Sequence, residues 1–184
     1  MEKRNKIINE LITLLKIAVV AFIVIYVMTA FVVRPIRVNG NSMYPTVSNN
    51  DIGFTNVISR IIGDIERFDV VIVFLPQQNE YLIKRVIGLP GETIHYQNNR
   101  LYVNGVFIPE PFLDQRFMNQ YMTHNNRNFT ADFAPVTVAE GQFFLIGDNR
   151  PNSMDSRSQG TYASEQIIGR RAIIVFPFRN MRIR

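Results

Sequence analysis

One stretch, YLIKRVIGLPGE at residues 81–92, indicates the fold most clearly. It starts as a run of Leu, Ile and Val, which favour β-strands, and it ends in a Gly-Leu-Pro-Gly turn. Alternation along a strand places Lys84 on the same face as Leu82 and Val86, and Arg85 on the opposite face. The pattern does not decide which face is buried. Taken alone, a lysine in such a strand is more often a side chain that extends to solvent from a strand edge than a reactive amine.

The strand pattern continues through most of the chain after residue 38. Short segments rich in Val, Ile, Phe and Tyr alternate with turn residues, without a long helical period or an internal repeat. Asn104-Gly105, whose two residues both tolerate positive φ, predicts a hairpin. The predicted fold is mostly β, with two antiparallel sheets. We expect strands at residues 69–75, 80–87, 93–97, 100–103, 106–108, 136–138, 143–146 and 172–176.

Residues 114–132 differ from their surroundings in composition. They are rich in Asn, Gln and Arg and contain few of the residues that favour strands. This composition predicts an exposed insertion within the domain. No candidate site is identified in it.

The N-terminal part of the chain carries an apolar segment. From Ile17 to Val33 no charged side chain occurs, and residues 11–15 are largely apolar as well. We therefore expect a cytoplasmic segment at 1–10, a single-pass transmembrane helix at 11–33 and an extracytoplasmic domain at 34–184. A cleaved secretory signal is disfavoured, because its apolar region would be shorter and because Met28-Thr29-Ala30 begins with a bulky residue.

The formal net charge of +5 is concentrated around this apolar segment. Residues 1–37 contain six basic and two acidic side chains. Basic groups beside a membrane helix have anionic lipid as their natural partner, so the lipid membrane is an expected partner and nucleic acid is not. More basic residues precede the helix than follow it, which modestly favours a domain on the extracytoplasmic side of the cell membrane. The chain has no cysteine, so disulfides and thiol chemistry are excluded.

A first candidate for chemistry is Ser42, within VNGNSMYPT at residues 38–46. Gly40 and Asn41 allow a sharp turn before the serine, and Pro45 stiffens the chain after it. Such a turn can present a hydroxyl beside free backbone N–H groups. On these residues alone, an ordinary solvent-exposed turn serine is the commoner interpretation.

A second candidate is Lys84, because the chain has only four lysines. The other three, Lys3, Lys6 and Lys16, all lie before the end of the predicted membrane helix. Arginine stays protonated, whereas a buried lysine can lose its proton near neutral pH. Lys84 is therefore the only long amine of the domain that could act as a base.

A third candidate region is FLIGDNRPNSMDSRS at residues 144–158. Its alternating acidic and basic residues can form an ordered network, and this structural role is favoured over direct catalysis. A calcium loop is disfavoured because Arg150 occupies the third ligand position. The only histidines, His95 and His124, lie outside any motif for a catalytic triad or a zinc site. We expect neither a metal nor a cofactor.

Taken together, these regions resemble the type I signal peptidases, specifically the compact form found in Gram-positive bacteria. The resemblance rests on four motifs in order after an apolar anchor. They are GNSMYPT at 40–46, RFDVV at 67–71, KRVIGLPG at 84–91, and GDNR at 147–150 with the residues that follow as far as Arg157.

The resemblance implies a membrane-bound serine endopeptidase with a Ser/Lys dyad, which removes signal peptides from exported preproteins. Ser42 would attack the scissile carbonyl and neutral Lys84 would take its proton. Ser153 would orient Lys84, and Asp155 and Arg157 would form an ion pair that holds the loop. Some members have a serine two positions before the nucleophile as an oxyanion donor. This chain has Gly40 there, so the oxyanion would rely on backbone N–H groups.

The resemblance also implies substrates with small residues at the first and third positions before the cleaved bond (−1 and −3). An extended substrate could pair with the strand at 80–87. Ser42 lies nine positions after Val33, a reach of at most about 30 Å, so the serine stays near the bilayer. The candidate pocket walls are Ile36, Val38, Met43, Leu82 and Ile83.

Two alternatives remain open from the sequence. A self-cleaving Ser/Lys protease of the repressor type shares the dyad but is soluble, which the apolar anchor disfavours. A catalytically silent, membrane-tethered β-domain that binds preproteins or other partners would have the same architecture, and an assay is needed to separate it from an enzyme.

Overall fold

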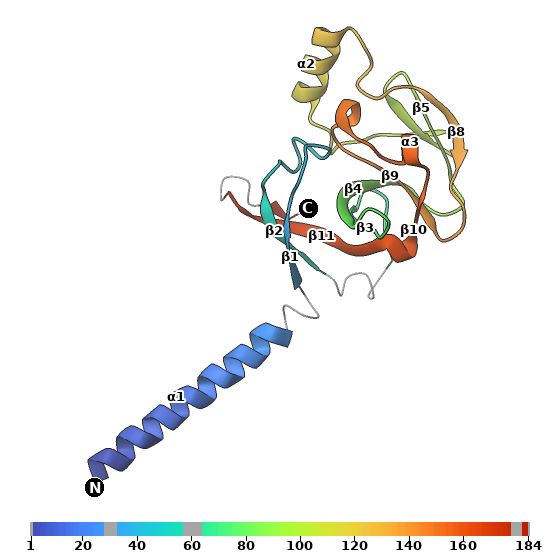
Figure 1. Ribbon diagram of the computed structural model, residues 1–184. Coiled ribbons are helices and arrows are strands. Elements are labelled where there is room, and N and C mark those ends of the chain that lie inside the picture. Colours follow the sequence, from blue (N-terminus) through green and yellow to red (C-terminus); the bar gives the residue numbers. More distant parts are fainter. Residues whose placement is uncertain (1, 28–32, 57–63, 178–181, 184) are drawn as a thin grey trace.

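The computed structural model describes residues 2–27, 33–56, 64–177 and 182–183. These residues form a long N-terminal helix and a β-rich domain with two antiparallel sheets (Figure 1). The predicted fold class, mostly β with an N-terminal apolar helix, is therefore confirmed.

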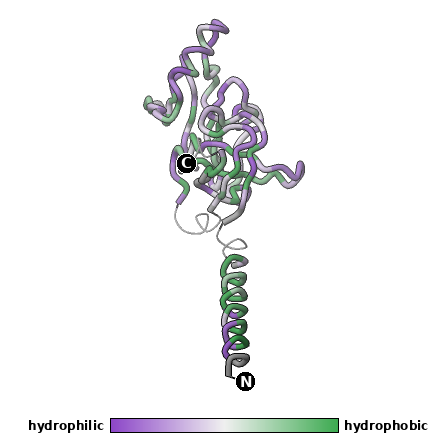
Figure 2. Tube along the Cα trace, turned by 90° about the vertical axis from the view of Figure 1, so that its left-hand side faces the viewer, coloured by the Kyte–Doolittle hydropathy of each residue, from purple (hydrophilic) through white to green (hydrophobic). Residues whose placement is uncertain are grey.

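The N-terminal helix, α1 (Glu2–Val27), begins earlier than the predicted span of 11–33. Its first turns are rich in Glu, Lys and Arg, which have high helix propensity and extend the helix beyond the apolar run. Residues Lys6–Tyr26 form the one described helix that is long and apolar enough to cross a membrane. Figure 2 shows hydrophilic residues near its start and hydrophobic residues over the rest. Residues 28–32 of the predicted span lie outside the described residues.

The larger sheet has eight strands within the described part of the chain, and its pairs are antiparallel. Their order is β1-β2-β11-β3-β4-β9-β10, and β12 pairs with β11. Strand β4 therefore lies in the interior, with β3 on one side and β9 on the other. The bounds are β1 (Val33–Arg37), β2 (Ile52–Asn56), β3 (Val70–Leu75), β4 (Glu80–Gly88), β9 (Gln142–Ile146), β10 (Tyr162–Ala163), β11 (Ile167–Phe176) and β12 (Arg182–Ile183).

The smaller sheet has the order β7-β6-β5-β8. The hairpin predicted at Asn104-Gly105 joins β6 to β7, and both residues have positive φ, 51° and 80°. The main core joins the two sheets, because Ile94 and Tyr96 of β5 cluster with Ile87 of β4 and Phe144 of β9. The bounds are β5 (Thr93–Gln97), β6 (Arg100–Val103), β7 (Val106–Ile108) and β8 (Phe133–Thr137).

Residues 114–132 contain a helix, α2 (Gln115–Asn125), whose N-cap Asp114 accepts a hydrogen bond from the Phe117 N–H. The polar side chains of this segment are exposed, except that of Thr130. Met118 and Phe129 are buried and cluster with Leu113, so the insertion also contributes to a small hydrophobic core. The remaining described helices are short: η3 (Arg150–Asn152), α3 (Ser156–Gln159) and η4 (Ser164–Gln166).

The strands predicted at 93–97, 100–103 and 106–108 match β5, β6 and β7, whereas others differ in length. The predicted strand at 172–176 is the second half of β11, and the one at 136–138 begins later than β8. Strands β1, β2, β10 and β12 were not predicted. Strand β1 contains Pro35 and β2 contains Gly53, and both residue types are depleted in strands.

Candidate active site

Ser42 lies in the loop at residues 38–51, between β1 and β2, which we call the serine loop. At the base of the loop, the Val38 N–H donates to the Asp51 carbonyl (2.9 Å) and the Asn50 N–H donates to the Val38 carbonyl (2.8 Å). Gly40 has a φ of +92°, a conformation that favours glycine. These contacts and the buried Met43, which directly follows Ser42, fix the turn on which the serine sits.

A second loop, at residues 147–158 after β9, is hydrogen-bonded to the serine loop; we call it the polar loop. The Asn149 N–H donates to the Ser42 carbonyl oxygen at 3.0 Å, and Asn149 Nδ2 donates to the Asn41 carbonyl oxygen at 3.0 Å. Thr46 Oγ1 donates to Asp148 Oδ2 at 2.5 Å. The half-buried Ser42 is thus tied to the polar loop by contacts at its own carbonyl and on both sides of it.

Lys84 lies on β4, where it pairs with Val71 of β3. As whole residues, Lys84 is only 2% exposed and Arg85 on the opposite face is 5% exposed, so both faces of this part of β4 are buried. The Lys84 amine donates a hydrogen bond to Ser153 Oγ at 3.2 Å. Burial lowers the pKa of Lys84 from 10.5 to about 8, and attraction by Asp155 offsets only part of this effect. A fraction of Lys84 is therefore uncharged at a pH close to neutral.

Asp155 and Arg157 form an ion pair within the polar loop. Arg157 Nε and Nη2 donate to the two carboxylate oxygens of Asp155, each at 2.8 Å, and the Gly147 N–H donates to Asp155 at 3.1 Å. Burial alone would raise the pKa of Asp155, but the hydrogen bonds and charge of Arg157 outweigh it and hold that pKa below its ordinary value. The loop that carries Ser153 is thereby closed around a buried carboxylate.

Two further charged pairs, which the sequence did not predict, anchor the polar loop to the sheets. Arg85 binds Asp148 through two hydrogen bonds, 2.8 Å from Nε and 2.6 Å from Nη2. Arg150 Nη2 donates to Glu110 Oε1 at 2.5 Å, and Arg150 Nη1 donates to Tyr96 Oη at 2.9 Å. Arg85, Asp148 and Arg150 stand within the motifs quoted above, but their partners are distant in the sequence and periodicity does not identify them.

The serine loop, the polar loop and the hydrogen-bond partner of Lys84 meet at Gly147. A Cβ atom at this position would clash with both Ser153 Oγ and the Ser42 carbonyl oxygen. The structure thus brings Ser42 and the predicted supporting residues Ser153, Asp155 and Arg157 into one region beside Lys84. Within the described residues, the hydrogen bond of the Lys84 amine goes to Ser153, and none joins it to Ser42.

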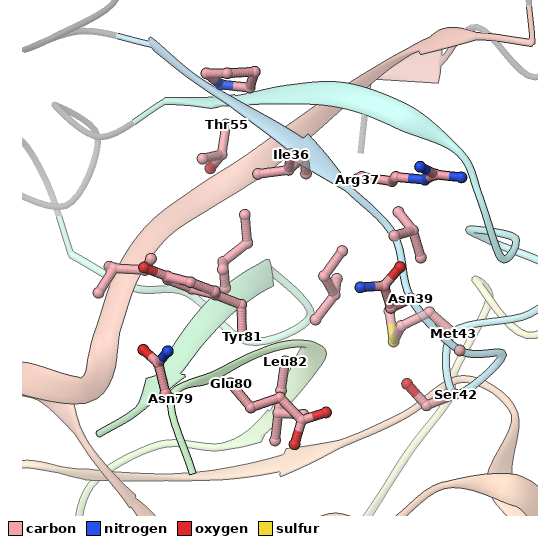
Figure 3. A pocket seen from close by; sticks show the side chains of 16 residues that line it. Ile36, Arg37, Asn39, Ser42, Met43, Thr55, Asn79, Glu80, Tyr81 and Leu82 are labelled. Carbon is pink, nitrogen blue, oxygen red and sulfur yellow. The ribbon is translucent and has the colours of Figure 1, made fainter. Parts of the chain in front are cut away.

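A cleft of about 400 Å³ opens beside Ser42 (Figure 3). Its walls come from β1 and from the first half of β4, and β2, β3 and β11 also contribute side chains. Lys84 itself is buried and is not among the residues that line it. The five predicted wall residues, Ile36, Val38, Met43, Leu82 and Ile83, all line the cleft together with Ser42.

The two histidines lie away from this region. His95 stacks on Tyr102 in the smaller sheet, and His124 is in the last turn of α2. Among the described residues, no group of three or more His, Asp and Glu side chains is arranged to hold a metal ion.

A turn serine beside a buried lysine of lowered pKa, in a domain of two antiparallel sheets, is the arrangement of a serine hydrolase of the Ser/Lys class. A family model described as "Signal peptidase, peptidase S26" matches residues 11–176. The chain therefore belongs to the signal peptidase family, peptidase S26.

Curated relatives and a solved structure agree with this assignment. The chain is 39% identical over 168 residues to a signal peptidase I of Bacillus amyloliquefaciens, which covers 91% of this chain and 86% of that protein. It is 37% identical to signal peptidase I S of Bacillus subtilis (strain 168), over 91% of this chain and 90% of that protein. A crystal structure of signal peptidase I from Enterococcus faecalis V583 is 36% identical, with a TM-score of 0.52, and the match covers 59% of this chain and 97% of that chain.

Proposed function

We propose that the protein is a membrane-anchored serine endopeptidase that removes signal peptides from exported preproteins, with Ser42 as nucleophile and Lys84 as general base. The observation that carries the proposal is the environment of Lys84. It is buried, its pKa is lowered to about 8, and its amine is oriented by Ser153 on the loop that also binds the Ser42 carbonyl. A catalytically silent binding domain does not need such an amine, and the curated relatives bear the name signal peptidase I.

The reaction would proceed through an acyl-enzyme. Ser42 Oγ attacks the scissile carbonyl carbon while its proton passes to the neutral amine of Lys84. The resulting ammonium then donates that proton to the nitrogen of the leaving chain as the C–N bond breaks. A water molecule, deprotonated by Lys84, attacks the ester, and the proton returns to Ser42 Oγ as the signal peptide leaves. The short hydrogen bond that this scheme requires between Ser42 and Lys84 would form when substrate closes the site.

The oxyanion of the tetrahedral intermediate needs hydrogen-bond donors close to Ser42. The Ser42 backbone N–H donates to no other group among the described residues, so it is available for this role. Gly40, where some family members have a serine, contributes no side-chain donor. The proposed oxyanion site is therefore built from the backbone, and the rigid serine loop holds its N–H in place.

The cleft suits an extended peptide. In the described part of the chain, residues 80–83 of β4 pair only with β3, and β1 pairs only with β2, so both strands offer free backbone groups where they line the cleft. A substrate strand could pair with them, with alternate side chains facing the apolar walls. Ile36, Val38, Met43 and Ile83 would lie close to the substrate backbone near the cleaved bond. The space that they leave would favour small side chains at −1 and −3.

The N-terminal helix would place this site at a membrane. A span at Lys6–Tyr26 has the length and composition to cross a bilayer, and basic residues precede it. We propose that the catalytic domain lies on the extracytoplasmic side, where the ends of inserted signal peptides emerge.

The test is cleavage of a preprotein with an Ala-x-Ala site by the full chain in detergent. Ser42→Ala and Lys84→Arg should abolish cleavage, because the first removes the nucleophile and the second replaces the base by a group that stays protonated. Ser164→Ala, outside the cleft, and Lys6→Arg, in α1, are the matched controls and should keep full activity. Cleavage by either of the first two variants at the wild-type rate would contradict the proposal.

A further inference from the structure

The cleft beside Ser42 contains a polar group that the proposed reaction does not use. Thr55 of β2 lines the cleft, and it is only 1% exposed. Its hydroxyl is the single buried side-chain polar atom of the described residues that has no hydrogen-bond partner. Buried polar groups in folded proteins are nearly always satisfied, because leaving one unpaired is costly. The hydroxyl of Thr55 therefore indicates a partner that comes from outside the described residues.

Apolar side chains form part of the cleft that Thr55 lines. Ile36 of β1, Ile72 of β3 and Ile168 of β11 line the same cleft. Figure 3 shows the Thr55 side chain projecting from β2 into the cavity beside Ile36, with Ser42 on the opposite side of the cavity. None of these three isoleucines can accept or donate a side-chain hydrogen bond. Thr55 thus places a hydroxyl beside the apolar side chain of Ile36, on the side of the cleft away from Ser42.

If the proposed function holds, the position of Thr55 determines which side chain of the substrate it can contact. A substrate in an extended conformation points alternate side chains to one face, so −1, −3 and −5 face the same wall. The −1 residue must lie at Ser42, where the bond is cut. Thr55 lies across the cleft from Ser42, so it would meet the side chain at −3 or at −5.

We propose that Thr55 forms a subsite for a small hydroxyl side chain, serine or threonine, at position −3 or −5 of the signal peptide. The hydroxyls of Thr55 and of the substrate would form one hydrogen bond inside the cleft. Threonine and valine have nearly the same shape, so this hydrogen bond is the main difference between them as substrate residues. Without the Thr55 hydroxyl, the apolar wall would favour valine.

The experiment uses the full chain in detergent and two pairs of peptide substrates that share alanine at −1. The first pair differs only in threonine or valine at −3, and the second differs in the same way at −5. The ratio of kcat/KM for threonine over valine is measured for the wild type, Thr55→Val and Thr55→Ser. Thr137→Val, on β8 of the smaller sheet, is the matched control. A substrate with alanine at −1, −3 and −5 reports activity that is independent of the subsite.

We expect the wild type to prefer threonine by about three- to tenfold at one of the two positions, the usual effect of one hydrogen bond. Thr55→Val should lose or reverse this preference, while Thr55→Ser and Thr137→Val should keep it. A wild type that cleaves the alanine substrate but shows no preference for threonine overturns the subsite, as does a preference that survives in Thr55→Val. The wild-type measurement decides the question even if Thr55→Val does not fold. Failure of the wild type to cleave the alanine substrate would instead contradict the proposed function.

Discussion

The amine of Lys84 on β4 donates a hydrogen bond of 3.2 Å to the hydroxyl of Ser153, which follows 69 positions later in the polar loop. A long lysine side chain has several rotatable bonds, so a buried amine needs a partner that fixes its direction. Ser153 supplies that partner, and the ion pair of Asp155 with Arg157 holds the loop on which it lies. The loop thus orients the proposed base through a single hydroxyl, while the charges of Asp155 and Arg157 act on the pKa of the base.

Ser153→Ala should lower kcat and leave KM nearly unchanged. The variant removes the group that orients the proposed base but does not touch the cleft walls, so we expect kcat to fall by about tenfold or more. Steady-state kinetics with an Ala-x-Ala substrate measure both constants. Ser153→Thr retains a hydroxyl and should recover part of the rate, whereas a purely structural role for Ser153 would lower thermal stability without changing kcat in the remaining folded protein.

The rate should depend on pH through Lys84. Only the neutral amine can accept a proton, and its pKa is about 8, so kcat/KM should fall about tenfold per pH unit below this value and level off above it. Glu80 raises the pKa of Lys84, so Glu80→Gln should shift the profile to lower pH. The measurement is kcat/KM from pH 6 to about pH 10. A rate that does not change with pH across this range would show that no titrating lysine takes part.

The fold was predictable where local signals are strong. The hairpin at Asn104-Gly105 and the alternating segments around it predicted three strands of the smaller sheet with their bounds. Strand β2 could not be predicted, because its sequence IGFTN contains glycine and asparagine and it is stabilised by pairing on both sides, with β1 and β11. Tertiary pairing there outweighs local propensity.

Part of the candidate site was predictable from the amino-acid composition. Lys84 stands out because it is the only lysine after residue 16, whereas the pairing of Asp155 with Arg157 was implied by the resemblance to the type I signal peptidases. The partners of Arg85 and Arg150 lie 63 and 40 positions away, and nothing in a local pattern links them. The unsatisfied hydroxyl of Thr55 is likewise a property of the folded cleft alone.

Breaking the buried pair of Arg85 and Asp148 should destabilise the protein strongly. The two side chains are 6% and 2% exposed, so Asp148→Asn leaves the Arg85 charge buried without its partner, at a cost of about 3–5 kcal/mol. Thermal unfolding of the detergent-solubilised protein measures the effect. Glu92→Gln, in the more exposed pair with Arg67, is the control and should cost clearly less. Equal losses in the two variants would contradict the role assigned to the buried pair.

The last prediction concerns the insertion, whose helix α2 reaches the serine loop. The Phe117 ring lies edge-on to Tyr44 with ring centroids 5.2 Å apart, and it also contacts Phe129 at 5.6 Å. Tyr44 is two residues from Ser42, so the contact couples the insertion to the position of the proposed nucleophile. Phe117→Ala should cost about 2 kcal/mol of stability through lost packing, and it should also lower kcat.

The control for this prediction is Phe107→Ala on β7, where a half-exposed ring contacts Tyr102 in the smaller sheet. This variant should lose less stability and keep its kcat, because Phe107 belongs to the sheet that carries no proposed catalytic residue. Unfolding temperature and kcat are measured for both variants at a temperature where both are folded. If Phe117→Ala loses stability but keeps the wild-type kcat, the insertion supports the fold alone, and the serine loop is held by its contacts with Asn149 and Asp148.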